Sequence, residues 1–302
     1  EGLVTVNLDG LWKAREADDN VRRDGTTIDT DDRDWSELLV PGHWQSHDDF
    51  ATSDGPLIYR RHFTAPPPAA GQRRWLTFDG ICYQGDAWLD GAYLGDPQGT
   101  FFPHSFDITA LSQLDDDHVV ALELTCAPET IDRRRNLTGA LQASAAVPST
   151  SNPGGIWRSV RVHDTGPVRI DRLRVLCRDA DTTRAHLRLH ARIDSLTGHR
   201  ATLRTSAGGE VVDEHDVELA AGLNDVEWGL DLADPQLWWP RSLGDQPLTT
   251  IVVAVDVDGS VSDECSRRTG LREVAWSNWV CSINGERLFL KEKLLGQSRD
   301  KI

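Results

Sequence analysis

The 302-residue sequence contains no methionine and no uninterrupted apolar run of the roughly 18 residues that a membrane-spanning helix requires. Its first residues, Glu1-Gly2-Leu3-Val4, lack the basic stretch followed by an apolar one that marks a secretory signal. We therefore expect no contact with a membrane. A chain without methionine, even at its start, is also expected to be a trimmed piece of a longer protein.

Cysteine is scarce, with five residues, an odd number, and no Cys-x-x-Cys pair. The wide spacing argues against a disulfide framework and against a structural zinc site, so neither a metal nor a cofactor is predicted. We expect buried thiols, and one bridge, for example Cys177 to Cys265, stays open as an alternative. Unpaired cysteines without a secretory signal favour the cytoplasm over secretion.

Basic residues are outnumbered, because 32 Lys and Arg stand against 48 Asp and Glu, for a formal net charge of −16. Such a surface repels polyphosphates, which excludes nucleic acid as a partner. The hydrophobic fraction of 39% is that of a globular chain, and 302 residues are most simply two domains.

Common catalytic signatures are also missing, since no Gly-x-Ser-x-Gly elbow, His-Glu-x-x-His motif or dinucleotide-binding glycine pattern occurs. Carboxylates are plentiful, but a sequence does not show which two would stand at the separation that acid–base catalysis needs. The residues by themselves therefore assign no catalytic group.

What the sequence does contain is alternation of period two. Apolar residues occupy every second position from Ala185 to Ile193, with His and Arg between them, and no convincing helix of twelve residues occurs. Asp90-Gly91 and Asn284-Gly285 are dipeptides typical of tight hairpins. These patterns predict an all-β protein of two antiparallel sandwiches: a jelly-roll-like domain over residues 1–165 and an immunoglobulin-like one after it.

Tryptophan is the one compositional excess, with eleven residues. Its ring stacks well on the apolar face of a sugar. Trp88 and Trp228 lie on alternating strands and are expected in the core. Trp44 and Trp239 lie near predicted turns, so they are candidates for contact with a ligand.

A series of short motifs runs through the first half of the chain, beginning with Asp32-Arg33-Asp34-Trp35 and Val40-Pro41-Gly42-His43-Trp44 and continuing at residues 59–63, 78–80, 87–91, 94–95, 102–109 and 154–160. Together they resemble the sugar-binding domain that opens the enzymes of glycoside hydrolase family 2. That family includes β-galactosidases, β-mannosidases and β-glucuronidases.

The second half continues the resemblance. Leu237-Trp238-Trp239-Pro240 is similar to the immunoglobulin-like domain of β-mannosidases and exo-β-glucosaminidases in the family, and residues 283–291 are similar to the passage into its catalytic (β/α)8 barrel. The resemblance implies an immunoglobulin-like domain over residues 166–275 and the start of the barrel domain at 276–302. The rest of the barrel is absent from this sequence.

The resemblance also implies retaining hydrolysis of a terminal β-linked sugar by two glutamates of the barrel. One of them follows an asparagine in the family, yet none of the seven asparagines here precedes a glutamate. We therefore expect no catalytic residue in this chain, and no hydrolysis by it alone. Its partners would be a β-linked oligosaccharide or glycoside and its own catalytic barrel in the full-length protein, and a homo-oligomer is compatible with the sequence.

Substrate contacts are expected in the loop before Gly155, where the family can extend an aspartate towards the substrate. Residues 145–153 contain no acidic residue here. Asn152 and Arg135 are the nearest substitutes for hydrogen bonds to sugar hydroxyls, although a solvated loop is the alternative. Together with Trp44 and Trp239, they are the predicted substrate-binding residues.

A stand-alone carbohydrate-binding or scaffold module without hydrolase activity is the alternative function. The two hypotheses differ at the end of the chain. A fragment should expose an apolar patch near Trp276 and Trp279, where the barrel would dock, whereas a natural module should have a polar end.

Overall fold

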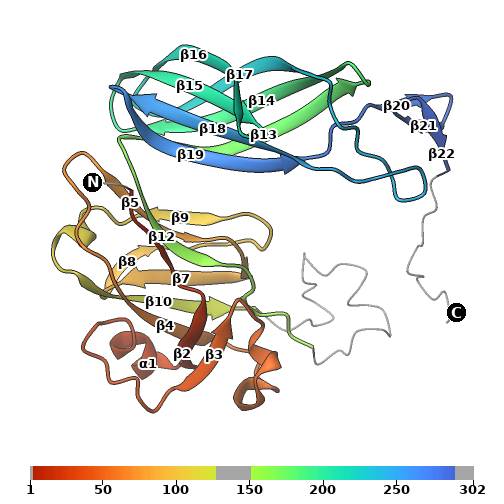
Figure 1. Ribbon diagram of the computed structural model, residues 1–302. Coiled ribbons are helices and arrows are strands. Elements are labelled where there is room, and N and C mark those ends of the chain that lie inside the picture. The colour runs from red at the N-terminus through yellow and green to blue at the C-terminus, as the bar shows by residue number, and fades with distance from the viewer. Residues whose placement is uncertain (1–2, 127–150, 290–302) are drawn as a thin grey trace, which may run out of the picture. The chain divides into compact units, whose positions relative to one another are not determined.

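A computed structural model describes residues 3–126 and 151–289. The chain forms two compact units, of which unit 1 ends at Asp164 and unit 2 begins at Thr165. Strands make up almost all of the regular structure (Figure 1). The prediction of an all-β protein is confirmed, and the described residues contain no (β/α)8 barrel. Within these residues, no helix has the length and apolar character needed to span a membrane.

Unit 1 is a jelly-roll-like sandwich with one six-stranded and one four-stranded sheet. The larger sheet has the order β3 (Ser36–Val40), β2 (Gly10–Glu16), β4 (Leu57–Thr64), β10 (Asp117–Thr125), β7 (Gln84–Leu89) and β8 (Ala92–Gly95). The smaller has the order β1 (Thr5–Asn7), β12 (Val160–Thr165), β5 (Arg73–Phe78) and β9 (His104–Asp107). The remaining elements are β6 (Ile81–Cys82) paired with β11 (Gly155–Ile156), the helix α1 (Asp19–Asp24), and the 3-10 turns η1 (Trp44–Ser46), η2 (Asp48–Phe50) and η3 (Leu111–Gln113).

The core of unit 1 lies between its two sheets, where Trp12, Trp44 and Phe78 are fully buried. Strand β10 is central because it pairs antiparallel with both β4 and β7. Its continuous apolar run, from Val119 to Leu122, suits a strand that is covered on both faces.

A buried arginine holds the segment that connects β2 to β3, residues 17–35. The guanidinium of Arg60 donates to the backbone carbonyls of Gly25 (2.5 Å), Thr27 (2.9 Å) and Thr30 (3.4 Å). It also donates to the carboxylate of Asp32 (3.0 Å) and lies over the ring of Trp35. This arrangement explains why a fully buried charge is tolerated, since its hydrogen bonds are satisfied.

Unit 2 is an immunoglobulin-like sandwich whose two sheets pack face to face (Figure 1). One has the order β13 (Val168–Ala180), β14 (Arg184–Ser195), β17 (Gly222–Ala233), and the other β16 (Glu210–Leu219), β15 (His199–Ala207), β18 (Thr249–Val257), β19 (Ser260–Thr269). Ala185 and every second residue up to Ile193 are buried, as their alternation predicts. Trp228 packs against the same core while its Nε1 donates to the hydroxyl of Thr205 (3.2 Å).

A small three-stranded sheet follows the unit 2 sandwich, formed by β20 (Val274–Ser277), β21 (Val280–Ile283) and β22 (Glu286–Leu288). The Asn284-Gly285 turn has φ values of 51° and 83°, and Asp90-Gly91 has 51° and 84°. Both predicted two-residue hairpins are therefore confirmed, in the left-handed conformation that Gly and Asn tolerate.

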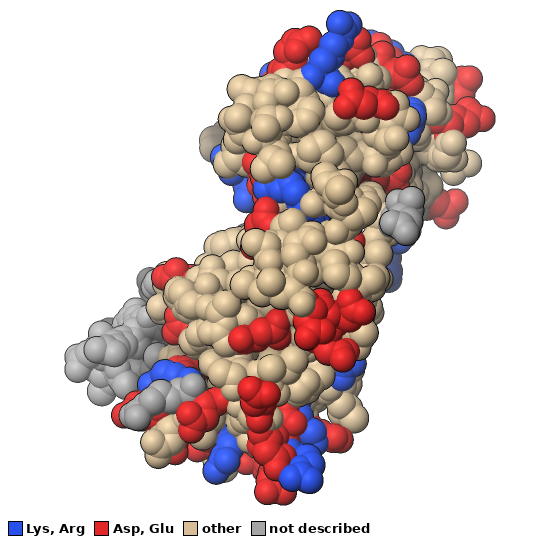
Figure 2. All heavy atoms as spheres, turned by 90° about the vertical axis from the view of Figure 1, so that its left-hand side faces the viewer, with Lys and Arg blue, Asp and Glu red and all other residues tan. Residues whose placement is uncertain are grey.

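All five cysteines lie in the described residues, and none forms a disulfide. The thiol of Cys177 contacts the carbonyl of Asp179 (3.6 Å). On the face shown in Figure 2, acidic side chains are spread over the surface with basic ones between them. This distribution agrees with the acidic net charge.

Candidate functional site

The candidate site lies at the end of unit 1 where β10 ends at Thr125 and β11 begins at Gly155. Trp44 forms its buried floor, because its backbone N–H donates to Gly154 O (3.0 Å) and its Nε1 donates to Ser53 O (3.0 Å). A Cβ added to Gly154 would lie 2.0 Å from the Trp44 ring, so only glycine fits there. Trp44 has no exposed surface, which leaves none for stacking on a sugar.

Asn152 joins the segments that meet here and is only 2% exposed. Its Nδ2 donates to Cys126 O (2.8 Å) and to the Asp54 carboxylate (3.1 Å), and its Oδ1 accepts from Gly154 N (3.0 Å). Its own backbone N–H donates to Gln45 Oε1 (2.7 Å). The side-chain amide and the backbone N–H of Asn152 are therefore engaged inside the protein, where they position its neighbours.

Two exposed polar residues at this end escaped the sequence analysis. Asp54 accepts the hydrogen bond from Asn152 yet remains solvent-exposed, so its carboxylate is oriented and accessible. His43 is also exposed, and its Nδ1 donates to Pro153 O (2.9 Å), which leaves Nε2 available. The turn residues Gly55-Pro56 after Asp54 are the sequence signal that could have drawn attention to it.

A second cluster in unit 1 contains the aromatic residues Trp157 and Phe101. Trp157 follows β11, and its Nε1 donates to Thr100 O (3.1 Å). The guanidinium of Arg158 lies 4.3 Å from the Trp157 ring centroid, and Phe101, which is 64% exposed, packs edge-on against that ring. Because the indole N–H is already engaged, the rings of this cluster offer apolar surface, and exposed Arg158 is its hydrogen-bond donor.

Trp239, another predicted contact residue, belongs to unit 2, and Arg135 lies outside the described residues. Trp239 is partly exposed, and its backbone is held by Asp245 O (2.8 Å) and by Gln246 Nε2 (3.1 Å). The structure thus brings Trp44 and Asn152 together around Gly154 and places Trp239 in the other unit.

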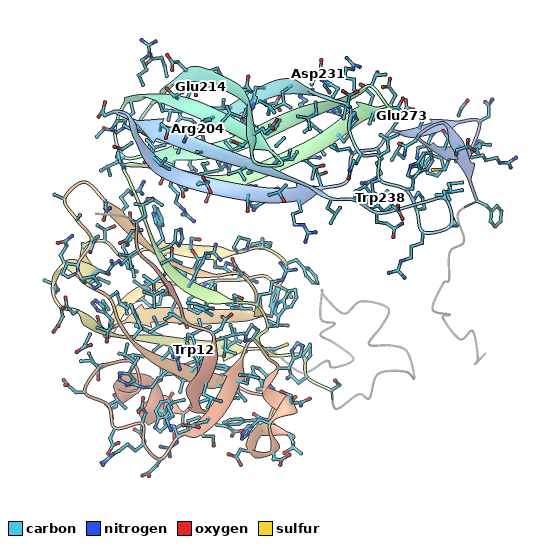
Figure 3. The ribbon with its side chains drawn as sticks, in the orientation of Figure 1. Trp12, Arg204, Glu214, Asp231, Trp238 and Glu273 are labelled. Atoms are coloured by element: carbon cyan, nitrogen blue, oxygen red, sulfur yellow. The ribbon has the colours of Figure 1, made fainter. Side chains whose placement is uncertain are left out.

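The loop that contains Trp239 anchors the β20–β22 hairpin. Asn284 Nδ2 donates to Trp238 O (3.1 Å), and Glu273 N donates to Asn284 Oδ1 (2.9 Å). Arg272 lies 4.6 Å from the Trp238 ring centroid. Figure 3 shows Trp238 and Glu273 at the end of unit 2 that carries the hairpin. Beyond this anchor, Trp276 is 61% exposed and Trp279 is 97% exposed.

In the part of the chain that the structure describes, no group of three or more His, Cys, Asp or Glu side chains is arranged so that it could hold a metal ion. The carboxylate of Asp32 is taken by Arg60 and His62. Partial burial alone would raise the pKa of Asp32, but the hydrogen bonds from Arg60 and His62 hold it below its ordinary value.

Unit 2 also carries a polar hollow of about 530 Å³ on the outer face of the four-stranded sheet, near Arg204 and Glu214 (Figure 3). Its arginines are committed to ion pairs, Arg200 with Asp216 (2.7 Å) and Arg204 with Asp256 (3.1 Å). We therefore give it no functional role.

Comparison with known proteins gives a consistent result. Residues 45–163 match the glycosyl hydrolase 2 galactose-binding domain-like family, and residues 168–272 match glycosyl hydrolases family 2. The chain belongs to glycosyl hydrolase family 2. In this family-2 chain, the two matched segments fall one in each compact unit.

Relatives of this family-2 chain include an exo-β-D-glucosaminidase of Hypocrea jecorina, 28% identical over 250 residues that cover 76% of this chain and 27% of that protein. A β-mannosidase B of Aspergillus oryzae is 25% identical over 242 residues, 73% of this chain and 28% of that protein. A family 2 β-glucuronidase structure superposes with a TM-score of 0.75 at 22% identity, covering 95% of this chain and 32% of that one. The chain spans about a quarter of the length of the curated relatives it matches.

Several motifs that carry the family 2 resemblance turn out to build the fold. Arg60 and Asp32 hold the excursion before β3, and Gly154 makes room for Trp44. Gly270 similarly makes room for Trp238, because a Cβ there would lie 2.7 Å from the ring.

Proposed function

We propose that this chain is the non-catalytic N-terminal portion of a retaining exo-β-glycosidase that removes terminal β-linked sugars. In this proposal both catalytic glutamates belong to a (β/α)8 barrel supplied by the full-length protein. The order of the two family 2 domains supports it, since the galactose-binding-like match precedes the second match as two separate units.

The observation that carries the proposal is the apolar end of unit 2. Trp276 and Trp279, in the β20–β21 hairpin, are 61% and 97% exposed, and Phe289, directly after β22, is 76% exposed, although tryptophan and phenylalanine normally gain by burial. An exposed apolar group of this kind marks an interaction surface. We propose that residues 276–302 begin the catalytic domain and that this hairpin packs against it.

We propose that the end of unit 1 around Asn152 forms part of the rim of the sugar pocket. Asp54 is the residue best suited to contact a sugar, because Asn152 orients its exposed carboxylate, which can accept from two hydroxyls. His43 would supply a ring nitrogen beside it. In this role Asn152 and Trp44 act from beneath as supports, while direct contact by Arg135 or Trp239 stays a prediction.

The sugar is proposed from the relatives. The sequence favours a β-mannosidase or β-galactosidase type, and the curated relatives described above are named exo-β-D-glucosaminidase and β-mannosidase B. We therefore propose a β-mannoside or β-glucosaminide ahead of a β-galactoside.

A panel of nitrophenyl β-glycosides tests the catalytic part of the proposal. The purified 302-residue chain should release no nitrophenol above the buffer control, whereas the protein extended by its downstream reading frame should hydrolyse at least one substrate. Turnover by the purified short chain would overturn the proposal. If the reading frame ends near Ile302 and calorimetry shows glycan binding, the chain is a stand-alone carbohydrate-binding module.

Variants test the role of the hairpin. In the extended protein, Trp276→Ala with Trp279→Ala should lower the melting temperature and the activity, because the docking contact is lost. In the short chain the same change should leave the melting temperature within about 2 °C, since exposed side chains contribute little to stability. Tyr93→Ala, which alters an exposed aromatic residue in unit 1, is the matched control. Equal effects of the two changes in the extended protein would contradict docking at the hairpin.

A further inference from the structure

Two cysteine thiols face each other in unit 1, next to the hydrogen bonds that Asn152 makes. The Sγ atoms of Cys82 and Cys126 are 3.8 Å apart, and the residues are 5% and 2% exposed. They are separated by 44 positions in the sequence, so their proximity is a product of the fold and not of local spacing.

The backbone around the two thiols is already arranged as neighbouring antiparallel strands. Tyr83 N donates to Thr125 O (3.2 Å), and Gln84 stands opposite Thr125 in the β7–β10 register. Cys82 directly precedes Tyr83 in the sequence, and Cys126 directly follows Thr125. This register places Tyr83 opposite Cys126, so Cys82 is offset by one residue from the position directly opposite, and the two side chains meet at the Sγ–Sγ distance of 3.8 Å.

The backbones of both cysteines also form hydrogen-bonded contacts with the segment that contains Asn152 and Gly155. Cys82 pairs with Gly155 in the β6–β11 ladder, and the carbonyl of Cys126 accepts the hydrogen bond from Asn152. To form a disulfide, the sulfur atoms must move from 3.8 Å to the bonding distance of about 2.05 Å, a short displacement for two neighbouring side chains.

We propose that Cys82 and Cys126 form a site of reversible disulfide formation, with a low-molecular-weight disulfide such as oxidised glutathione as the oxidant. The thiolate of one cysteine attacks a glutathione sulfur, which forms a mixed disulfide and releases one glutathione thiolate. The second thiolate then attacks the protein sulfur of that mixed disulfide and releases the second glutathione. The two protein thiols lose two electrons and two protons, and oxidised glutathione gains them as two glutathione thiols.

The bond would tie β6 to the end of β10. These are the two segments that Gly155 and Asn152 connect at the candidate site. A covalent link across 44 positions restricts the unfolded chain, so the oxidised protein should melt several degrees higher than the reduced one.

The site should be selective among the five cysteines. Cys177 instead contacts the Asp179 carbonyl, and all three other cysteines, Cys177, Cys265 and Cys281, belong to unit 2, whereas Cys82 and Cys126 belong to unit 1. Oxidation of the folded chain should therefore link Cys82 to Cys126 and leave the other three as thiols.

Mass spectrometry after equilibration with glutathione and alkylation tests the proposal. Trypsin leaves both cysteines on one peptide, residues 75–133, because no Lys or Arg lies between them, so an Asp-specific protease must be used to separate them. We expect one linked pair that is two hydrogens lighter than the separate peptides, with Cys177, Cys265 and Cys281 alkylated. Dithiothreitol should reverse both the link and the rise in melting temperature.

Two controls keep the outcome decisive. Cys82→Ser should abolish the link and the rise in melting temperature, whereas Cys177→Ser should retain both. Refolding from denaturant in the same glutathione buffer exposes the thiols before they are buried, so inaccessibility would not explain a failure there. The proposal is overturned if neither the folded nor the refolded chain links Cys82 to Cys126, or if another pair links in preference.

Discussion

Replacing Asn152 with alanine should destabilise the protein by about 2–4 kcal/mol. The side chain makes two donor contacts, to Cys126 O and Asp54, and accepts one from Gly154 N. Each intramolecular hydrogen bond contributes about 0.5–1.5 kcal/mol, and a buried group left without a partner costs about 1–3 kcal/mol. Cys126 and Gly154 are buried, so their polar groups pay this cost unless water enters the space that the side chain leaves.

Urea unfolding of the whole chain measures the global effect, and amide hydrogen exchange at Gly154 measures the local one. Exchange there should accelerate at least tenfold, since the Gly154 N–H loses its acceptor. Asn152→Asp keeps an acceptor for Gly154 but places a second carboxylate beside Asp54, so it should destabilise at pH 7 as much as alanine does. Asn20→Ala, at an exposed position on α1, should have almost no effect.

The reasoning would be refuted if Asn152→Ala left stability within about 0.5 kcal/mol of the parent chain and did not change exchange at Gly154. That result would return Asn152 to the role predicted from the sequence, a loop residue available to a sugar. A loss of stability with unchanged exchange at Gly154 would instead place the important contact at Cys126 or Asp54.

Three further changes test other parts of the structure by urea unfolding. Arg60→Met should lower the free energy of unfolding by about 3 kcal/mol, because it removes a buried guanidinium that donates to three carbonyls and to Asp32. The control Lys13→Ala, at a partly exposed ion pair, should lower it by less than about 1 kcal/mol. Gly154→Ala should cost more than about 2 kcal/mol because its Cβ would meet the Trp44 ring, and a cost near zero would contradict the packing. Burial raises the pKa of Asp263 to about 6, so the folded state binds this proton more readily than the unfolded state, and stability from this group should rise as the pH falls from 7 towards 4. Asp263→Asn should remove that rise, worth up to about 2–3 kcal/mol, and equal pH dependence in both proteins would contradict it.

The strands of unit 2 could be predicted from the sequence because their signal is local. Alternate burial along β14 requires only that one face of the strand meets a core, and the residues from Ala185 to Ile193 state that pattern directly. The Asn284-Gly285 turn is local in the same sense, since its φ values depend on those two residues.

The candidate site could not be predicted in the same way, because its contacts join distant segments. Asn152 looks like a solvated loop residue in the sequence, yet its partners lie 26 positions away at Cys126 and 98 away at Asp54. Trp44 is buried because Gly154, 110 positions away, leaves space for its ring. The sequence singled out this region through Asn152 and Trp44, but it could not distinguish a residue that would touch a ligand from one that supports its neighbours.

Tryptophan illustrates why that distinction depends on the partner and not on the residue type. Trp12 and Trp44 are fully buried, and each donates its indole N–H to a backbone carbonyl, Leu8 O (2.7 Å) and Ser53 O (3.0 Å). Trp276 and Trp279 are mostly exposed, although full burial of a large apolar side chain contributes about 1.5–3 kcal/mol. The segment from β20 to β22 thus exposes two tryptophans within four residues, and Asn284 ties it to Trp238 by a hydrogen bond. We therefore expect any catalytic domain that completes this protein to dock on the hairpin, and the sugar-contacting groups of unit 1 to lie on its Asn152 end.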